Sequence, residues 1–292
     1  MEGFQISSPL IWKEEESERV LVGKILASKV YTKSATEVIL RKAWNLQDGF
    51  DVIAISDNAF MFKFTASEEF DRVLRGRPWS INGSLLNLME RTKYKSFEEF
   101  DFSRCPVWIQ LHNVPMEAMC LENAITIGGY VGEVVLAEDP VYNGRLLRSF
   151  LRVRVVLDLR KPLSSGFWLP RPDGQQVWIS IRFEKLQNFC YNCGKIGHEN
   201  KSCGSVKLMS LAHPSEPRFG DWITMNACRS WDEVVTVVNK DWAEAGSAMK
   251  RKDEALNRRR NKDNSHGNKM SSSNDENLFV IKVLKSAHVE ES

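Results

Sequence analysis

The first hundred residues alternate between apolar positions spaced as in a strand and apolar positions spaced as in a helix. Four strand segments are predicted, at 19–30, 50–56, 59–65 and 84–91. Residues 34–46 and 67–76 instead show helical spacing, and each begins at a serine that can cap a helix. The predicted order of elements is therefore β-α-β-β-α-β.

This order is the split βαβ plan of ferredoxin-like and RRM-like domains, here over residues 19–95. Phe60, Phe62 and Phe64 share one face of a strand. We expect that face to point into the core, because exposing three phenyl rings would cost about 1.5–3 kcal/mol each. The other face then carries no aromatic side chain, so we do not expect this sheet to stack RNA bases as an ordinary RRM does.

A second, incomplete copy of the plan is predicted over residues 104–187. Its strands are expected at 106–115, 133–139, 149–159 and 175–186. A helix is expected at 116–132, and the loop 160–174 stands where the second helix of the plan would be. The predicted fold class is thus α+β, with a ferredoxin-like domain followed by a partial α+β repeat.

The strands of this second unit place aromatic and basic side chains on the face away from the core. Alternation puts Trp108 outward on the first strand, Arg152 and Arg154 on the third, and Trp178 and Arg182 on the last. Such side chains on one face can stack bases and contact phosphates. The alternative is that they pack against the first domain or against loops, and an error of one residue in register would reverse the face.

Composition sets limits on the class of protein. The 292 residues suffice for two or three small domains, and 42% of them are hydrophobic, enough to bury a core. The 40 basic and 38 acidic residues nearly cancel, so any basic surface has to be local. No apolar run can cross a bilayer, and the N-terminal arm, residues 1–18, lacks the features of a signal peptide. We therefore expect no membrane partner and a nuclear or cytoplasmic location, where thiols stay reduced.

Residues 188–204, called the knuckle below, contain three cysteines and a histidine. Cys190, Cys193, His198 and Cys203 have the spacing C-x2-C-x4-H-x4-C. Three thiolates and one imidazole complete a tetrahedral Zn²⁺ shell, which predicts a structural rather than a catalytic ion. So short a segment buries no core, so the metal would supply the folding free energy, on the order of 10 kcal/mol or more. The alternative is a chance cluster of buried thiols.

The stretch CYNCGKIGH resembles the zinc knuckle of retroviral and retroelement nucleocapsid proteins, which binds single-stranded nucleic acid. The resemblance implies that Tyr191 forms one wall of a base-binding cleft. Glu199 stands where that family has an apolar second wall, and we expect Ile196 to replace this wall in part. Lys195 and Lys201 are expected to contact phosphate.

A set of short motifs occurs in order between residues 19 and 203. They include VLVGKILASK, FMFKF, GRPWSINGSLLNLMER, PVWIQLHNVP and FLRVRVVLDLRKPL, followed by the knuckle. Their order resembles the gag-like, first-open-reading-frame proteins of plant LINE-type retrotransposons. Those proteins carry plant domain-of-unknown-function family 4283 followed by a CCHC knuckle. The resemblance implies a nucleic-acid-binding protein.

After the knuckle, residues 205–292 lose regular patterning. A helix is expected to start at a capping Ser230, and from about residue 246 the composition predicts disorder. The stretch KRKDEALNRRR contains two basic triplets. They are either a nuclear-localisation signal, an additional electrostatic contact for nucleic acid or a solvated charge run. The nucleus is the favoured location.

These features predict a zinc-dependent, non-enzymatic protein that binds single-stranded nucleic acid, with RNA favoured. The sequence has no Gly-rich phosphate loop, nucleophile elbow or paired-aspartate polymerase motif, so we expect neither catalysis nor a small-molecule substrate. The alternative is a protein–protein adaptor that docks partners or copies of itself through the knuckle and the sheet. Salt dependence separates the two, because phosphate contacts weaken steeply with ionic strength.

Overall fold

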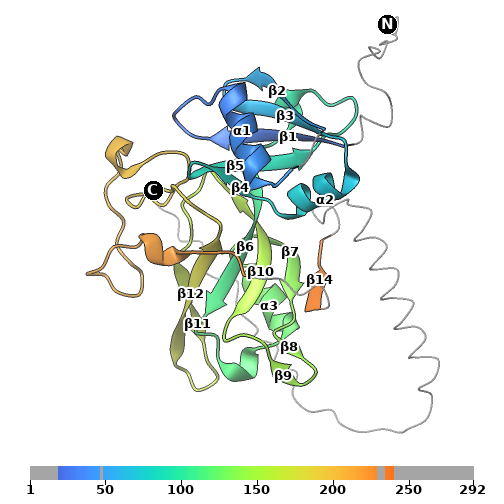
Figure 1. Cartoon of the computed structure of the whole chain (residues 1–292). Coiled ribbons are helices and arrows are strands. Elements are labelled where there is room, and N and C mark those ends of the chain that lie inside the picture. Colours follow the sequence, from blue (N-terminus) through green and yellow to red (C-terminus); the bar gives the residue numbers. More distant parts are fainter. Residues whose placement is uncertain (1–18, 47–48, 229–233, 240–292) are drawn as a thin grey trace, which may run out of the picture.

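The computed structural model describes residues 19–46, 49–228 and 234–239, which form two sheet-based units (Figure 1). The N-terminal sheet has five strands, the C-terminal sheet has seven, and a separate hairpin has two. Nearly all strand pairs are antiparallel, and three α-helices accompany them in the described ranges. None of these helices is both long and apolar enough to span a bilayer.

The N-terminal sheet has the strand order β2-β3-β1-β5-β4. Its strands are β1 (Val20–Leu26), β2 (Phe50–Ser56), β3 (Ala59–Phe64), β4 (Trp79–Ile81) and β5 (Ser84–Glu90). Two helices, α1 (Lys33–Ala43) and α2 (Ser67–Arg75), pack against one face of this sheet (Figure 1). The elements follow the predicted order, with the short strand β4 added before the last strand.

In both helices the N-cap is a residue other than the predicted serine. The hydroxyl of Thr32 caps α1 by accepting a hydrogen bond from the backbone N–H of Ala35 at 3.3 Å, so Ser34 lies inside the first turn. In α2, Ser67 is the first helical residue, and Ala66 before it makes no side-chain cap. Capping depends on which residue has extended backbone angles, and spacing alone does not choose between neighbouring hydroxyls.

Aromatic side chains fill the core between this sheet and its helices. Phe60, Phe62 and Phe64 are almost fully buried, which confirms the predicted core face. Trp44 follows α1, and its ring centroid lies 5.5 Å from those of both Phe50 and Phe62 in edge-to-face packing. Each such pair adds about 0.5–1.5 kcal/mol beyond the burial of area.

The opposite face of the N-terminal sheet is covered by the segment that follows β5. This segment includes the 3-10 helix η2 (Phe97–Glu99) and packs Phe100 and Phe102 against Val22. The buried Asn87 anchors it by donating from Nδ2 to the backbone carbonyl of Phe102 at 3.0 Å. Described residues thus close this face, in keeping with the expectation that it does not stack bases.

The C-terminal sheet has the strand order β11-β12-β6-β10-β7-β14, and β13 pairs in parallel with β12. Its strands are β6 (Arg104–His112), β7 (Glu133–Glu138), β10 (Leu151–Asp158), β11 (Gly166–Pro170), β12 (Gln176–Glu184), β13 (Thr224–Met225) and β14 (Val235–Val237). The smaller elements are β8 (Val141–Tyr142), β9 (Arg145–Leu146), α3 (Leu121–Gly128) and the 3-10 helices η3 (Met116–Ala118), η4 (Asn200–Ser202) and η5 (Asp221–Ile223).

Three sequence predictions for this unit need correction. The helix expected at 116–132 is split into η3 and the shorter α3. The loop expected at 160–174 contains β11, which pairs with β12 along its whole length. The helix expected from Ser230 does not extend over β14, a strand that completes the sheet edge beside β7. The arm 1–18 and the tail predicted to be disordered lie outside the described residues.

The C-terminal sheet has an inner face, which packs on α3, and an outer face on its other side. Val153 and Ile181 on the inner face belong to the larger core of the molecule. This core continues past the sheet to Phe189 and Phe219, which lie at the knuckle. The knuckle is therefore attached to the end of a hydrophobic core.

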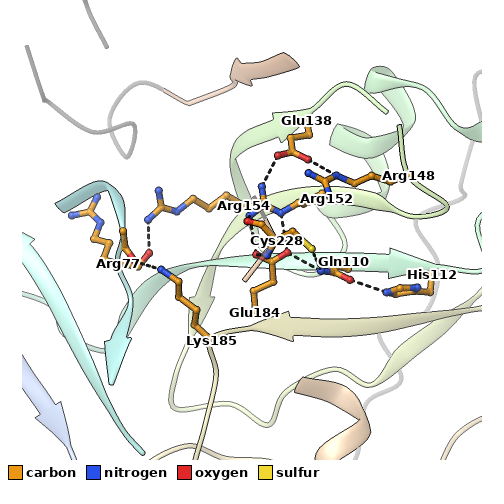
Figure 2. Close-up of polar contacts among 11 residues, drawn as sticks. Arg77, Gln110, His112, Glu138, Arg148, Arg152, Arg154, Glu184, Lys185 and Cys228 are labelled. Carbon is orange, nitrogen blue, oxygen red and sulfur yellow. Dashed lines mark hydrogen bonds and ion pairs between the residues drawn. The ribbon is translucent and has the colours of Figure 1, made fainter. Parts of the chain in front are cut away.

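Polar contacts join the two units at one end of the C-terminal sheet (Figure 2). Arg154 donates from Nη2 to the backbone carbonyl of Arg77 at 2.8 Å, and Lys185 donates from Nζ to that of Gly76 at 2.7 Å. The ammonium of Lys185 also lies 4.8 Å from the ring centroid of Trp79. Two cations of the second unit thus hold the turn between α2 and β4 of the first.

Candidate functional site

The structure brings together the four side chains predicted to bind a metal. One ligand atom from each of Cys190, Cys193, His198 and Cys203 lies within 4.8 Å of the others. Cys193 Sγ and His198 Nε2 are 3.4 Å apart. Ligand atoms held about 2.0–2.3 Å from a tetrahedral ion stand about 3.3–3.8 Å from one another, so this donor set fits Zn²⁺ after a small contraction.

Backbone hydrogen bonds and two glycines fold the chain around this cluster. The N–H of Gly194 donates to the carbonyl of Cys190 at 2.7 Å, and the N–H of Cys190 donates to the carbonyl of Lys195 at 2.8 Å. Gly194 has a φ of +73° and Gly197 a φ of +99°, both in the left-handed region that favours glycine. The turn after the C-x2-C pair therefore requires the glycine that the sequence supplies.

The knuckle packs against the core of the C-terminal unit. Phe219 covers Gly194 so closely that a Cβ atom there would lie 2.3 Å from the Phe219 ring. The N–H of Leu163 donates to the carbonyl of Gly194 at 2.9 Å. Phe189 and Phe219 pack edge to face, with their ring centroids 6.4 Å apart. These contacts fix the orientation of the metal site relative to the sheet.

The thiols of the cluster differ in acidity. Hydrogen bonds from the His198 side chain and the Ser205 backbone lower the pKa of the Cys203 thiol to about 6. Burial raises the pKa of the Cys193 thiol to about 11. A zinc ion binds thiolates, so when bound it would hold all three sulfurs deprotonated and stabilise the fold. Four protein ligands leave no open position on the ion for a reacting water.

The predicted nucleic-acid contacts within the knuckle are divided between its surface and its packed side. Tyr191, Lys195 and Lys201 are exposed. Ile196 instead packs against the C-terminal core and forms a β-bridge with Phe189. Partial replacement of a cleft wall by Ile196 stays a prediction, and this partly buried side chain also attaches the knuckle to the body.

Arg152 and Arg154 are buried, contrary to the prediction that they face an open surface. Each is only 2% exposed. Arg152 binds Glu184 through two hydrogen bonds, Nε to Oε1 and Nη2 to Oε2, both at 2.8 Å, and donates from Nη1 to Glu138 Oε1 at 2.5 Å (Figure 2). Both arginines do point to the outer face, as the alternation predicted. That part of the face is covered by other segments of the chain.

The turn at Arg77 covers Arg154, and residues that follow the knuckle cover Arg152. The backbone N–H of Cys228 donates to Glu184 Oε2 at 3.3 Å, and Gln110 donates from Nε2 to Cys228 Sγ at 3.0 Å. Trp108 is half-buried, packs near Val235 of β14, and has the Arg152 guanidinium 4.0 Å from its ring centroid. Trp108 therefore belongs to this covered region and not to an open stacking surface.

Trp178 and Arg182 lie on the part of the outer face that remains accessible, and both are half-buried. The Trp178 ring packs against Trp168, with centroids 5.3 Å apart. Arg182 contacts Met225 Sδ at 3.6 Å, and within the described ranges no carboxylate forms an ion pair with it. Sequence reasoning missed Trp168 because it treated 160–174 as a loop. The apolar run Phe-Trp-Leu after Gly166 was the signal of a strand.

A hairpin beside the knuckle, residues 205–219, was also missed. The N–H of Leu208 donates to the carbonyl of Asn192 in the knuckle at 2.9 Å, and the N–H of Arg218 donates to the carbonyl of Leu208 at 2.9 Å. Three other apolar side chains of this hairpin are exposed: Val206, Met209 and Leu211. This stretch has no apolar periodicity, because a hairpin held by a few backbone contacts needs no regular alternation.

Comparison with known proteins agrees with this order of parts. Residues 13–99 match the family described as Domain of unknown function (DUF4283), and residues 157–205 match the family described as Zinc knuckle. The second match begins in β10 and includes β11 and β12, so it extends well beyond the metal-binding segment. A zinc knuckle is generally a nucleic-acid-binding module.

One curated relative is similar over part of its length. The chain is 24% identical over 131 residues to Uncharacterized protein At4g02000 of Arabidopsis thaliana. The alignment covers 45% of this chain and 41% of that protein. The chain therefore matches less than half the length of this relative.

Proposed function

We propose that this protein binds single-stranded nucleic acid, with RNA favoured, through a zinc-stabilised knuckle held on an α+β body, and that it catalyses no reaction. The observation that carries the proposal is the set of three thiols and one imidazole within 4.8 Å, in a segment that matches a zinc knuckle. Exposed Tyr191 offers a ring to a base, and exposed Lys195 and Lys201 offer charge to phosphates.

The N-terminal unit has a supporting role in this proposal. We assign it the ferredoxin-like plan, which the strand order β2-β3-β1-β5 with helices on one face supports. Phe100 and Phe102 cover the face on which an RRM would stack bases, so this unit is expected to position the second one. A retroelement gag-like role and a nuclear location belong to the same proposal. The order of the two family matches supports the first, and the basic triplets at 250–260 support the second.

Fluorescence anisotropy of the zinc-loaded full chain with labelled single-stranded RNA, single-stranded DNA and duplex tests the proposal. We expect one zinc per chain, preference for single strands and a steep loss of affinity with salt. Cys190→Ser should lose the metal and weaken binding. Cys120→Ser is the matched control, because Cys120 is a free thiol outside the cluster. Failure of the zinc-loaded chain to bind any polynucleotide at low salt would refute the proposed function.

A second candidate function is a protein–protein adaptor, favoured by the exposed apolar side chains of the hairpin 205–219. Val206, Met209 and Leu211 offer an apolar surface that a partner or a second copy could cover. Association through such a surface should persist as salt is raised, whereas binding to phosphates should not. Sedimentation of the zinc-loaded chain at low and high salt, with and without RNA, separates the two functions.

A further inference from the structure

Four aromatic rings gather on the accessible part of the outer face, where β11, β12, β6 and β10 lie side by side. We call them the aromatic platform: Trp168, Trp178, His112 and Phe150. Trp168 pairs directly with Trp178 across β11 and β12. The His112 and Phe150 rings have their centroids 5.0 Å apart. Trp168 is 46% exposed, and the other three rings are half-buried.

We propose that the aromatic platform stacks the bases of an unpaired nucleic-acid strand and that Arg182 contacts its phosphates. The inference rests on the proposed single-strand binding and assigns a second contact surface for the same ligand. Aromatic rings bind bases without reading sequence, since every base has a π face.

Small residues separate the two pairs of rings. Gly166 and Ser180 are paired across β11 and β12, and Ser180 is paired in turn with His112 of β6. The Trp178 ring lies over Gly166, where a Cβ atom would come within 2.6 Å of it. Of the described strand positions, those between Trp178 and His112 thus carry only the small side chains of Gly166 and Ser180, which leaves room for a planar ligand to contact both pairs of rings.

The charges on this face favour an anionic ligand over a cationic or neutral one. Two buried carboxylates on this face, Glu138 and Glu184, are both bound by Arg152, and Glu138 also binds Arg148. Arg182 has no carboxylate ion pair among the described residues, so its positive charge is available to a ligand. Burial, together with the charge of Arg182, lowers the pKa of His112 to about 4, so its ring is neutral near pH 7 and can stack as an uncharged aromatic.

β12 connects the platform to the knuckle along the chain, and its end at Glu184 is buried. From Trp178 to Glu184 this strand spans about 20 Å, at about 3.3 Å per residue, and the knuckle follows it directly. Met225, which contacts Arg182, also lines a cleft of about 520 Å³ whose walls include Trp79 and Lys185. A single nucleic-acid strand that binds both the platform and the knuckle would pass Arg182 and Lys185. Two linked contacts would raise its affinity above that of either contact alone.

The test uses the zinc-loaded full chain with Trp168→Ala, Trp168→Phe and the control Tyr130→Ala. Tyr130 is 52% exposed and packs near Phe167, whose side chain lies on the other face of β11. Titration with a short fluorescein-labelled single-stranded RNA should show a loss of about 5- to 100-fold for Trp168→Ala. Trp168→Phe should retain most of the affinity because it keeps a ring, and Tyr130→Ala should match wild type. Ultraviolet cross-linking should attach the RNA to the β11–β12 peptide of wild type.

Three outcomes would overturn the inference, and they are distinguishable. If wild type binds RNA in a zinc-dependent way and Trp168→Ala has the same RNA affinity, the platform does not bind RNA, and the proposed function stands. Wild type that binds no RNA at low salt removes both. Trp168→Ala that changes the sedimentation of the free protein but not its RNA affinity makes the platform a protein interface.

Discussion

Replacing Arg152 with methionine distinguishes a buried structural arginine from one that binds nucleic acid. Sequence alternation alone places Arg152 among the candidate phosphate contacts. In the folded chain it lies between Glu138 and Glu184, each no more than 3% exposed. Methionine is unbranched and flexible, so it can fill the space of the arginine stem but cannot compensate either carboxylate.

The expected loss follows from the contacts of this one guanidinium. It makes two hydrogen bonds to Glu184 and one to Glu138, and its removal leaves two buried carboxylates without this cation. Breaking a buried ion pair from one side costs about 3–5 kcal/mol. A domain of ordinary stability has about 5–15 kcal/mol in total, so the variant should unfold at a much lower denaturant concentration.

Urea unfolding of the zinc-loaded chain, followed by circular dichroism, measures this loss. Arg182→Met is the matched control, because Arg182 lies on the same sheet face but has no ion pair among the described residues. It should change the free energy of unfolding by no more than about 0.5 kcal/mol. It should instead reduce the salt dependence of RNA binding by about one unit of slope, as expected for one lost phosphate contact.

The opposite pattern would refute the reasoning. If Arg152→Met unfolds at the wild-type urea concentration while its RNA affinity and salt slope fall, the buried network does not exist in solution. A second variant, Arg152→Met combined with Glu184→Leu, should recover part of the lost stability, because it removes the carboxylate that the loss of Arg152 leaves without an ion pair, whereas Glu138 keeps Arg148.

Three further outcomes are expected. Gly194→Ala should lower the free energy of unfolding by about 1–3 kcal/mol and weaken zinc binding, because the left-handed φ of Gly194 and the Phe219 ring both exclude a Cβ. Gly197→Ala should lower it less, since no atom lies within 4 Å of a new Cβ there. Equal losses of zinc affinity in the two variants, measured by zinc titration, would argue against the Phe219 contact. Since the pKa of His112 is about 4 in the folded chain and near 6.5 when unfolded, stability should fall by about 1–2 kcal/mol as pH drops from 6.5 to 4, and His112→Gln should abolish that part of the pH profile. Phe62→Ala, at the centre of the N-terminal core, should cost about 3–5 kcal/mol in urea unfolding, and a loss below about 1 kcal/mol would contradict the packing of Trp44 against it.

The candidate metal site could be predicted from sequence because its four side chains are close along the chain. Cys190, Cys193, His198 and Cys203 span fourteen residues, and local turns at Gly194 and Gly197 are enough to bring them together. The core face of β3 was equally accessible, since the alternation of Phe60, Phe62 and Phe64 leaves only one face able to bury three rings.

The availability of the outer sheet face could not be predicted in this way. Alternation correctly gave the direction of Arg152, Arg154 and Trp108 but carried no information about what lies over them. Cys228, β14 and the turn at Arg77 cover these side chains, and each contact joins residues far apart in sequence. When a segment distant in sequence buries one face of a strand, the alternation of apolar and polar residues in that strand does not record it.

The sequence by itself therefore determined which side chains form the candidate metal cluster, which segments form the four longer strands of the first sheet and which face of each strand is apolar. These properties depend on neighbours within about a dozen residues and on the short periods of helix and strand. Only the tertiary structure decided that the knuckle is attached to the body through Ile196 and Phe219, and that the outer sheet face is divided into a covered part and an open one. Those outcomes depend on which distant segments meet, and burial is a property of the whole fold.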